Sequence, residues 1–263
     1  MKKLFLVLAV LVLLAGCAPA AEKGTLQFNA NGEDFVRQGF VSKDGWAITF
    51  DHVYVTLADI TAYQSDPPYD PHAGSEVQAK VKVNLDGTHT VDLAEGGEDA
   101  PPILVGEVKD ATVGHYNAIH WKMARATSGP ASGYSLVIVG QAKKESQTVN
   151  FTIEVEQEYE YTCGEYVGDE RKGILQEGGT ADLEMTFHFD HIFGDAETPL
   201  DDELNVGAPG FEPFAGIVGG AGGLRVDLSG LQAELSAGDY RMLVDILPTL
   251  GHVGEGHCHC EVR

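Results

Sequence analysis

The stretch that decides the fold class is Ala47-Ile-Thr-Phe-Asp-His-Val-Tyr-Val-Thr-Leu-Ala-Asp-Ile-Thr-Ala-Tyr63. Apolar residues occupy alternate positions in it, which is typical of a strand that buries one face. The alternation changes phase near Asp51 and His52, and an extra residue of this kind predicts a β-bulge. The sequence therefore predicts a long strand with a local bend.

Further strands are predicted wherever short runs of β-branched and aromatic residues lie between turn residues such as Asp86-Gly87. These segments are Leu26–Asn29, Phe35–Ser42, Val77–Asn84, Thr88–Leu93, Ile103–Val108, Tyr116–Ala126, Tyr134–Gln141, Val149–Tyr161, Ile174–Gln176 and Ala181–Phe193. Many strands at short spacing, with no helical pattern between them, favour a mainly β fold. We expect an antiparallel β-sandwich.

Two segments interrupt this pattern, and a third changes type. Residues 64–74 carry three prolines and must form a loop, because proline cannot donate to a central β-ladder. Residues 200–223 are rich in glycine and proline and predict an excursion outside the sheet. From Leu228 to Leu247 the apolar residues follow helical spacing, and Pro248 and Gly251 are stop signals. We expect one or two short helices that pack on the sandwich and present the C-terminal tail.

The N-terminus has the features of a lipoprotein leader. Met1-Lys2-Lys3 precedes an apolar run that is too short for an ordinary membrane span but suits a secretory signal. The run ends in Leu14-Ala15-Gly16-Cys17, which resembles the bacterial lipobox. The resemblance implies cleavage before Cys17 and acylation of that cysteine. The expected product is anchored to a membrane of the bacterial cell envelope, on the extracytoplasmic side.

The predicted organisation follows from these segments. Residues 1–16 are a signal peptide, 17–23 a lipidated tether, 24–227 the β-sandwich domain, and 228–263 a helical segment with a tail rich in histidine and cysteine.

The chain is strongly acidic, with a formal net charge of −23 at pH 7. Removal of the leader, which carries two lysines and no acidic residue, takes this charge to −25. Such a surface repels nucleic acid and raises the local concentration of cations. Nucleic acid is therefore excluded as a partner. Two explanations account for the acidic surface equally well, namely attraction of cations and solubility alone.

The C-terminal tail concentrates ligands for transition metals. It contains three imidazoles and two thiols, from His252, His257, Cys258, His259 and Cys260. Imidazole and thiolate suit zinc and copper, whereas calcium and magnesium prefer oxygen. The tail therefore predicts a clasp for a Zn or Cu ion. In the alternative interpretation both cysteines form disulfides and the histidines are solvated.

The cysteine count fits an oxidising compartment. With Cys17 lipidated, three cysteines remain, Cys163, Cys258 and Cys260. A disulfide from Cys163 to either tail cysteine would fix the tail to the domain and leave one thiol free, while a Cys258–Cys260 bridge would be strained. All three could instead serve as thiolate ligands.

A short internal repeat supplies further candidate ligands. Residues 49–54 and 188–193 share Phe-Asp-His followed by an aliphatic and an aromatic residue. If both segments are strands that lie together, His52, His188 and His191 are candidate ligands, and Asp51 and Asp190 would orient them by hydrogen bonds. In a strand, His188 and Asp190 would face one way and His191 the other. Chance is the competing explanation.

Part of the chain resembles a known family. Residues 50–63, ending in Ile-Thr-Ala-Tyr, are followed by Val91-Asp-Leu and by Val113-Gly-His-Tyr-Asn-Ala-Ile119. This order is similar to the strand, Asp-Leu and Gly-x-Tyr-x-x-Ile pattern of MbnP-like bacterial proteins, which are secreted β-sandwiches linked to copper handling. The resemblance implies the same fold and a copper function. The chain departs from the four-cysteine pattern of part of that family.

These features support three hypotheses. The first is a lipid-anchored extracytoplasmic protein that captures, stores or delivers zinc or copper. The second is an interaction module with a structural metal that binds another envelope protein or a polysaccharide. The third is a metal-dependent hydrolase, which needs an open coordination position and a nearby carboxylate base. The sequence lacks His-Glu-x-x-His and Gly-x-Ser-x-Gly, so an enzyme is the less favoured class.

Overall fold

The computed structural model describes residues 22–218 and 223–263. The strands are β1 (Lys23–Asn31), β2 (Phe40–Val41), β3 (Ala47–Ser65), β4 (Ala79–Asp92), β5 (Ile103–Thr112), β6 (Gly114–His115), β7 (Ala118–Met123), β8 (Leu136–Lys144), β9 (Gln147–Val155), β10 (Tyr159–Cys163), β11 (Ile174–Leu175), β12 (Thr180–Phe187), β13 (Leu224–Asp227), β14 (Gly251–Val253) and β15 (Gly256–Val262). The helices are α1 (Glu33–Gln38), α2 (Asp190–Phe193), α3 (Glu203–Gly207), α4 (Glu212–Gly216), α5 (Leu228–Glu234), α6 (Ala237–Ile246) and the 3₁₀ turn η1 (Leu247–Thr249).

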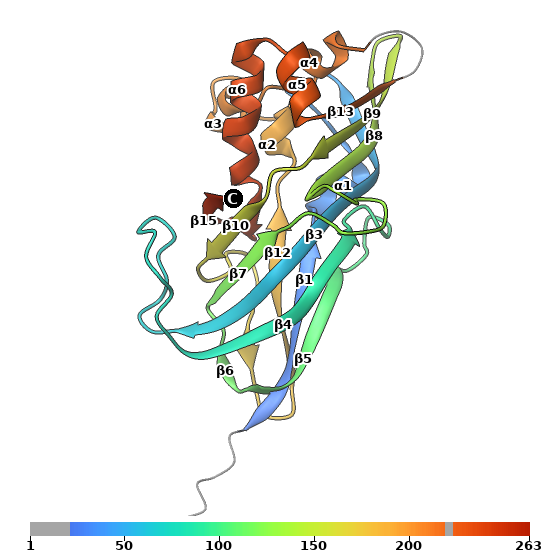
Figure 1. Cartoon of the computed structure of the whole chain (residues 1–263). Coiled ribbons are helices and arrows are strands. Elements are labelled where there is room, and N and C mark those ends of the chain that lie inside the picture. Colours follow the sequence, from blue (N-terminus) through green and yellow to red (C-terminus); the bar gives the residue numbers. More distant parts are fainter. Residues whose placement is uncertain (1–21, 219–222) are drawn as a thin grey trace, which may run out of the picture.

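One curled sheet dominates the described part of the chain (Figure 1). Its hydrogen-bonded order is β13-β9-β8-β3-β7-β10-β15-β14-β12-β1-β5, and β2 and β4 also pair with β3. The prediction of a mainly β fold is confirmed. The finer expectation of an antiparallel sandwich is not confirmed. Hydrogen bonds join these strands in one sheet, and this sheet is mixed, because β1 pairs in parallel with β12 and β13 pairs in parallel with β9.

The long strand β3 is the axis of this sheet. Along one edge it pairs first with β8 and then with β7, while β2 and β4 occupy the other edge. The register with β8 shifts between Phe50 and His52, which leaves Asp51 as the extra residue. The bulge predicted from the phase change is therefore confirmed, and it re-aims the second half of the strand.

The structure corrects one predicted turn. The segments around Asp86-Gly87 are not two strands, because β4 continues through both. Gly87 takes a positive φ of 102°, and the register with β3 shifts at this level, between Ala58 and Ile60. By sequence, Asp86-Gly87 favours a turn, but in the structure the glycine accommodates an irregularity within one strand.

The helices α2 to α6 gather at one end of the sheet (Figure 1). Of the one or two helices predicted after Leu228, two are present as α5 and α6, and each starts with a polar cap. Asp227 accepts from the Gly230 amide at 2.8 Å, and Ser236 accepts from the Asp239 amide at 3.1 Å. The excursion expected after Leu200 contains the short helices α3 and α4.

The C-terminal tail is part of the sheet and not a free extension. Residues 251–262 form the hairpin β14–β15, which lies between β12 and β10. Its turn needs a glycine at position 254, because φ is +59° there and a Cβ would lie 2.1 Å from the Val167 carbonyl oxygen. The tail strands within the predicted segment 228–263 therefore belong to the same sheet as the predicted β domain.

A group of phenylalanines forms the core beneath the helical end. Phe50 of β3 lies 6.4 Å, between ring centroids, from both Phe189 and Phe193, and Phe193 lies 5.8 Å from Phe211. Phe189, Phe193 and Phe211 are fully buried. Burial of each such ring stabilises the fold by about 1.5–3 kcal/mol. Helix α2 is therefore held in place by the packing of these rings.

None of the helices in the described residues combines the length and apolarity needed to cross a membrane. The predicted signal peptide and Cys17 lie outside the described residues. The tether expected at 17–23 overlaps β1, which already starts at Lys23.

Candidate metal centre

Four imidazoles from two distant parts of the chain meet at the helical end of the sheet. His188 and His191 come from the end of β12 and from α2, and His252 and His257 come from β14 and β15. Ring centroids of His188 lie 5.4 Å from His191 and 4.2 Å from His252. His191 and His252 are 5.2 Å apart, and His252 and His257 are 5.0 Å apart.

A change from strand to helix brings His188 and His191 together. The sequence predicted a strand through Phe193, in which these two side chains would face opposite ways. The strand ends at Phe187, however, and α2 begins at Asp190. In a helical turn, residues three apart lie on the same side. Phe189 and Phe193 enter the core, so the imidazoles are left on the other side.

The hairpin register brings the tail histidines to the same place. His252 pairs with Thr186 of β12 on one side and with His257 of β15 on the other. Directly paired residues on antiparallel strands project to the same face of the sheet. His188 follows Thr186 by two residues, and its backbone amide donates to the Leu250 carbonyl at 3.1 Å. This backbone pairing sets the spacing of the cluster.

Thr249 determines which nitrogen carries the proton in two of the rings. Its hydroxyl donates to the Ile246 carbonyl at 2.8 Å, so it accepts from Nδ1 of His191 at 2.9 Å. Its carbonyl oxygen can only accept, and it takes a hydrogen bond from Nε2 of His252 at 2.9 Å. The lone pairs of the neutral rings are therefore at Nε2 of His191 and Nδ1 of His252.

His188 is oriented by two acceptors at its Nε2. The Gly254 carbonyl oxygen lies 3.3 Å from this atom, and a Glu33 carboxylate oxygen lies 3.6 Å from it. The lone pair of the neutral ring is therefore at Nδ1. Glu33 has a φ of +57°, which is unusual for a residue with a side chain, and its amide donates to the Asn31 side chain at 2.9 Å. Such a backbone is often found at functional sites.

One nitrogen of the cluster is buried and unpaired within the described part of the chain. His252 is 3% exposed, and its Nδ1 is buried without a hydrogen-bond partner among the described residues. An unsatisfied buried group of this kind costs about 1–3 kcal/mol. Burial, together with the nearby imidazoles, lowers the pKa of His252 to about 3 and that of His191 to about 4. Both rings are therefore neutral near pH 7, which is the form that binds metals.

Asp190 adds a carboxylate to the group. It is 8% exposed, and burial raises its pKa while the charge of His188 opposes this shift. Ligand atoms of His188, Asp190 and His191 all lie within 4.8 Å of one another. With metal–nitrogen bonds of about 2.1 Å, two imidazole centroids on one tetrahedral ion are about 5 Å apart. Most of the observed spacings match this value, and the stacked His188–His252 pair at 4.2 Å is closer.

A pocket of about 320 Å³ opens beside the cluster. It is lined by His191, Glu203, Leu204, Ile246, Thr249 and His257. The pocket connects two of the four imidazoles with solvent and carries one acidic group at its wall.

His52 and Asp51 were predicted to share this site, and the structure places them elsewhere. Nδ1 of His52 lies 2.7 Å from an Asp92 carboxylate oxygen, and its ring stacks on Tyr54. Asp51 is the exposed residue of the bulge. The two repeated segments do meet, but through Phe50 and Phe189 in the core. The bulge explains this result. His52 follows Phe50 by two residues, but the extra residue between them changes the alternation, so His52 no longer faces the same side of the sheet as Phe50.

The tail cysteines are corrected as well. Cys258 forms a disulfide with Cys163, as one of the predicted alternatives had it, and is therefore not a thiolate ligand. Cys260 is a free cysteine that packs against the core, and burial raises the pKa of its thiol to about 12. In a strand, Cys258 and Cys260 face away from His257. The predicted His/Cys clasp is thus reduced to histidine and carboxylate.

His259 lies in a different, polar pocket of about 380 Å³. This pocket also contains His120 and Glu160, and its position follows from the pairing of Thr162 with both histidines. Nδ1 of His120 lies 3.0 Å from the Thr162 hydroxyl oxygen. His120 is therefore part of a cross-strand pair with Thr162.

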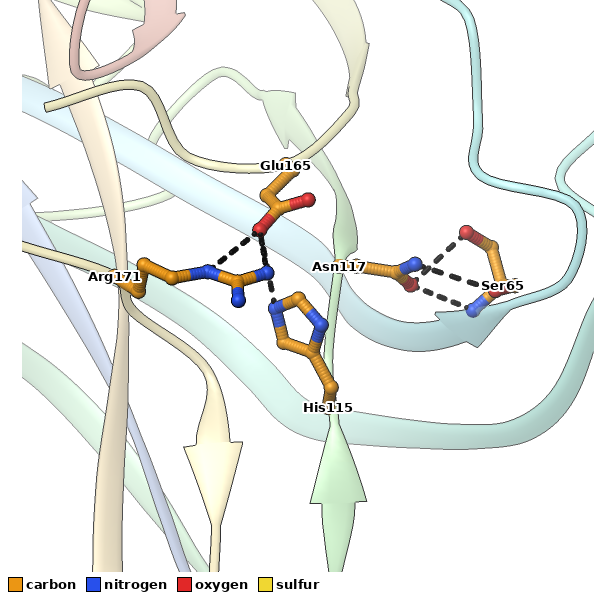
Figure 2. A network of polar contacts seen from close by, with 5 residues as sticks. All are labelled: Ser65, His115, Asn117, Glu165 and Arg171. Atoms are coloured by element: carbon orange, nitrogen blue, oxygen red, sulfur yellow. Dashed lines mark hydrogen bonds and ion pairs between the residues drawn. The ribbon is translucent and has the colours of Figure 1, made fainter.

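Another histidine belongs to a polar network that joins loops (Figure 2). Nε2 of His115 lies 3.6 Å from the Glu165 carboxylate, which also accepts from Arg171. In the same view the Asn117 side chain accepts from the amide and hydroxyl of Ser65 and fixes the end of β3. One imidazole beside an arginine-bound carboxylate does not make a metal site.

Sequence reasoning missed the residues that orient the ligands. Thr249, Glu33 and the Gly254 carbonyl act through positions that only the folded chain defines. The proximity of Thr249 and His252 in the sequence was visible, but a threonine three residues before a histidine is common. Comparison with known protein families, curated proteins and solved structures found no match for this chain.

Proposed function

We propose that this protein binds one divalent transition-metal ion, zinc or copper, at the cluster of His188, His191 and His252, with Asp190 as a nearby carboxylate. One observation carries the proposal, namely that Nδ1 of the buried His252 has no hydrogen-bond partner among the described residues and lies beside the imidazoles of His188 and His191. A metal ion satisfies such a lone pair and balances the charge of Asp190.

The donor set favours a divalent ion. Imidazole and carboxylate suit Zn²⁺ and Cu²⁺, whereas thiolate and thioether ligands select Cu⁺. Cys258 is held in the disulfide and Cys260 packs on the other side of the strand, so no thiolate from the tail enters the set. Ligand orientation is already provided, because each of the three rings has its second nitrogen in a hydrogen bond.

The cellular setting is part of the proposal. Acylation at Cys17 would hold the domain on the extracytoplasmic side of the envelope. The strong negative charge would concentrate cations near the surface. Capture, storage or delivery of zinc or copper at the envelope is the role that fits these features.

Metal uptake by the untagged mature domain tests the proposal. The protein is stripped with a chelator, dialysed against Zn²⁺ or Cu²⁺ at pH 7.5, and analysed for bound metal. We expect one ion per chain and a loss of affinity of at least about 100-fold in His191→Gln and in His252→Gln, since each removes one of three or four ligands.

Two matched variants separate this cluster from the predicted tail clasp. His89→Gln changes an exposed histidine of β4 and is expected to bind metal as the native protein does. Cys163→Ala combined with Cys258→Ala removes the disulfide and is expected to retain one site. The proposal fails if the native protein takes up neither metal, or if the two cluster variants bind as tightly as His89→Gln.

A further inference from the structure

We propose that His257 is an exchangeable ligand at the mouth of the cluster, through which the metal enters and leaves. This inference rests on the proposed metal site and adds the route by which the ion reaches and leaves it. It makes the site one that exchanges its ion with solvent or a partner, in contrast to a closed structural site.

The four imidazoles differ in their exposure. His188 and His252 are 7% and 3% exposed, whereas His257 is an exposed residue. His252 is nevertheless its cross-strand partner, and the two ring centroids are 5.0 Å apart. An ion bound to His257 can therefore reach His252 with little displacement. The three other rings are held by hydrogen bonds to Thr249 and Gly254.

The pocket connects these two environments. His257 and His191 both line it, so solvent reaches an exposed imidazole and one that is held by the Thr249 hydroxyl in the same space. Glu203 of α3 adds a carboxylate to the wall, and Leu204 and Ile246 make the remainder apolar. A hydrated cation is attracted by the carboxylate, and its water ligands can leave through the pocket mouth.

Stepwise exchange of ligands follows from this arrangement. An aqua ion first exchanges one water for a nitrogen of His257, and then further waters for His191 and His252. Release reverses these steps, and a competing ligand from outside replaces His257 before the anchored imidazoles let go. Each step replaces one donor by another at constant oxidation state, so no oxidant or reductant is needed. His257 therefore affects the rates of capture and release more than the number of ions bound.

The experiment measures transfer of Zn²⁺ from loaded protein to a colorimetric chelator in excess, followed by stopped flow, together with the amount of zinc bound at equilibrium. We compare the native protein with His257→Ala and with His259→Ala. His259 is a matched control, since it projects from the same strand two residues later but lines the other pocket. Both side chains are at least partly exposed, and thermal unfolding checks that the variants fold.

We expect His257→Ala to bind one zinc ion per chain and to slow both uptake and transfer by at least about tenfold, while His259→Ala matches the native protein. Equal transfer rates in the native protein and His257→Ala would overturn the inference. Loss of the bound zinc in His257→Ala would also overturn it, because His257 would then be a permanent ligand. Neither result removes the proposed metal site, which is tested separately by metal uptake of the native protein and of the His191→Gln and His252→Gln variants.

Discussion

Replacing Thr249 with valine tests how the ligands are held in place. The hydroxyl of Thr249 accepts a hydrogen bond from Nδ1 of His191, and its carbonyl accepts one from Nε2 of His252. Valine has nearly the same shape as threonine and keeps the carbonyl, so the substitution removes the partner of His191 and the hydrogen bond to the Ile246 carbonyl, but keeps the partner of His252. Without that partner, the ring can rotate and the proton can move to Nε2, the nitrogen proposed to bind the metal.

The expected magnitude follows from the role and exposure of this hydroxyl. Loss of a residue that orients a metal ligand typically lowers affinity by about 10–100-fold, which corresponds to about 1.4–2.7 kcal/mol. Thr249 is exposed, so a water molecule can replace its hydroxyl in part. We therefore expect a loss of affinity at the low end of this range, about tenfold for Zn²⁺.

Competition with a chelator of known affinity measures this change at pH 7.5. Thr249→Ser keeps the hydroxyl and is expected to bind like the native protein, and His89→Gln serves as the unrelated control. Unchanged affinity in Thr249→Val would refute the reasoning, as would an equal loss in Thr249→Ser and Thr249→Val. In either case the hydroxyl would not be what fixes the His191 ring.

Two further predictions concern pH and anchoring. In metal-free protein the pKa values of about 4 for His191 and about 3 for His252 lie below the unfolded value of 6.5, so the unfolded chain binds more protons below pH 6.5. Stability is therefore fully present above pH 6.5 and falls as the pH decreases toward 4 and then 3, by about 4 kcal/mol between pH 7.5 and 5 for the two groups together. Urea unfolding measures this, and a profile as steep in the His191→Gln/His252→Gln variant would contradict it. Cys17→Ser is expected to abolish acylation and release the protein from membranes, and unchanged membrane fractionation would argue against the lipobox.

Local sequence patterns predicted many of the elements, but the strand expected over Phe35–Ser42 is helix α1 followed by the short strand β2. The alternation in residues 47–63 predicted β3 and its bulge, and the spacing of leucines after Leu228 predicted α5 and α6. These features depend on neighbours within a few residues, so a single sequence contains the necessary information. The histidines of the cluster were also identified as candidates, because imidazole is a metal ligand in any fold.

The same local patterns were wrong where a long-range contact decides the structure. The period of two in residues 181–193 did not show that the strand ends at Phe187 and continues as α2, where the aromatic side chains enter the core. Asp86-Gly87 was read as a turn because glycine permits positive φ in turns and bulges alike.

By itself, the sequence determined that this chain is rich in strands, has a short helical segment before its C-terminal tail, and carries imidazoles at positions 188, 191, 252 and 257. Only the tertiary structure decided that these four meet while His52, His259 and the tail cysteines do not. The meeting depends on the register of β12 with β14 and of β14 with β15. A shift of one residue in such a pairing turns every side chain to the opposite face of the sheet, and no local pattern encodes that choice.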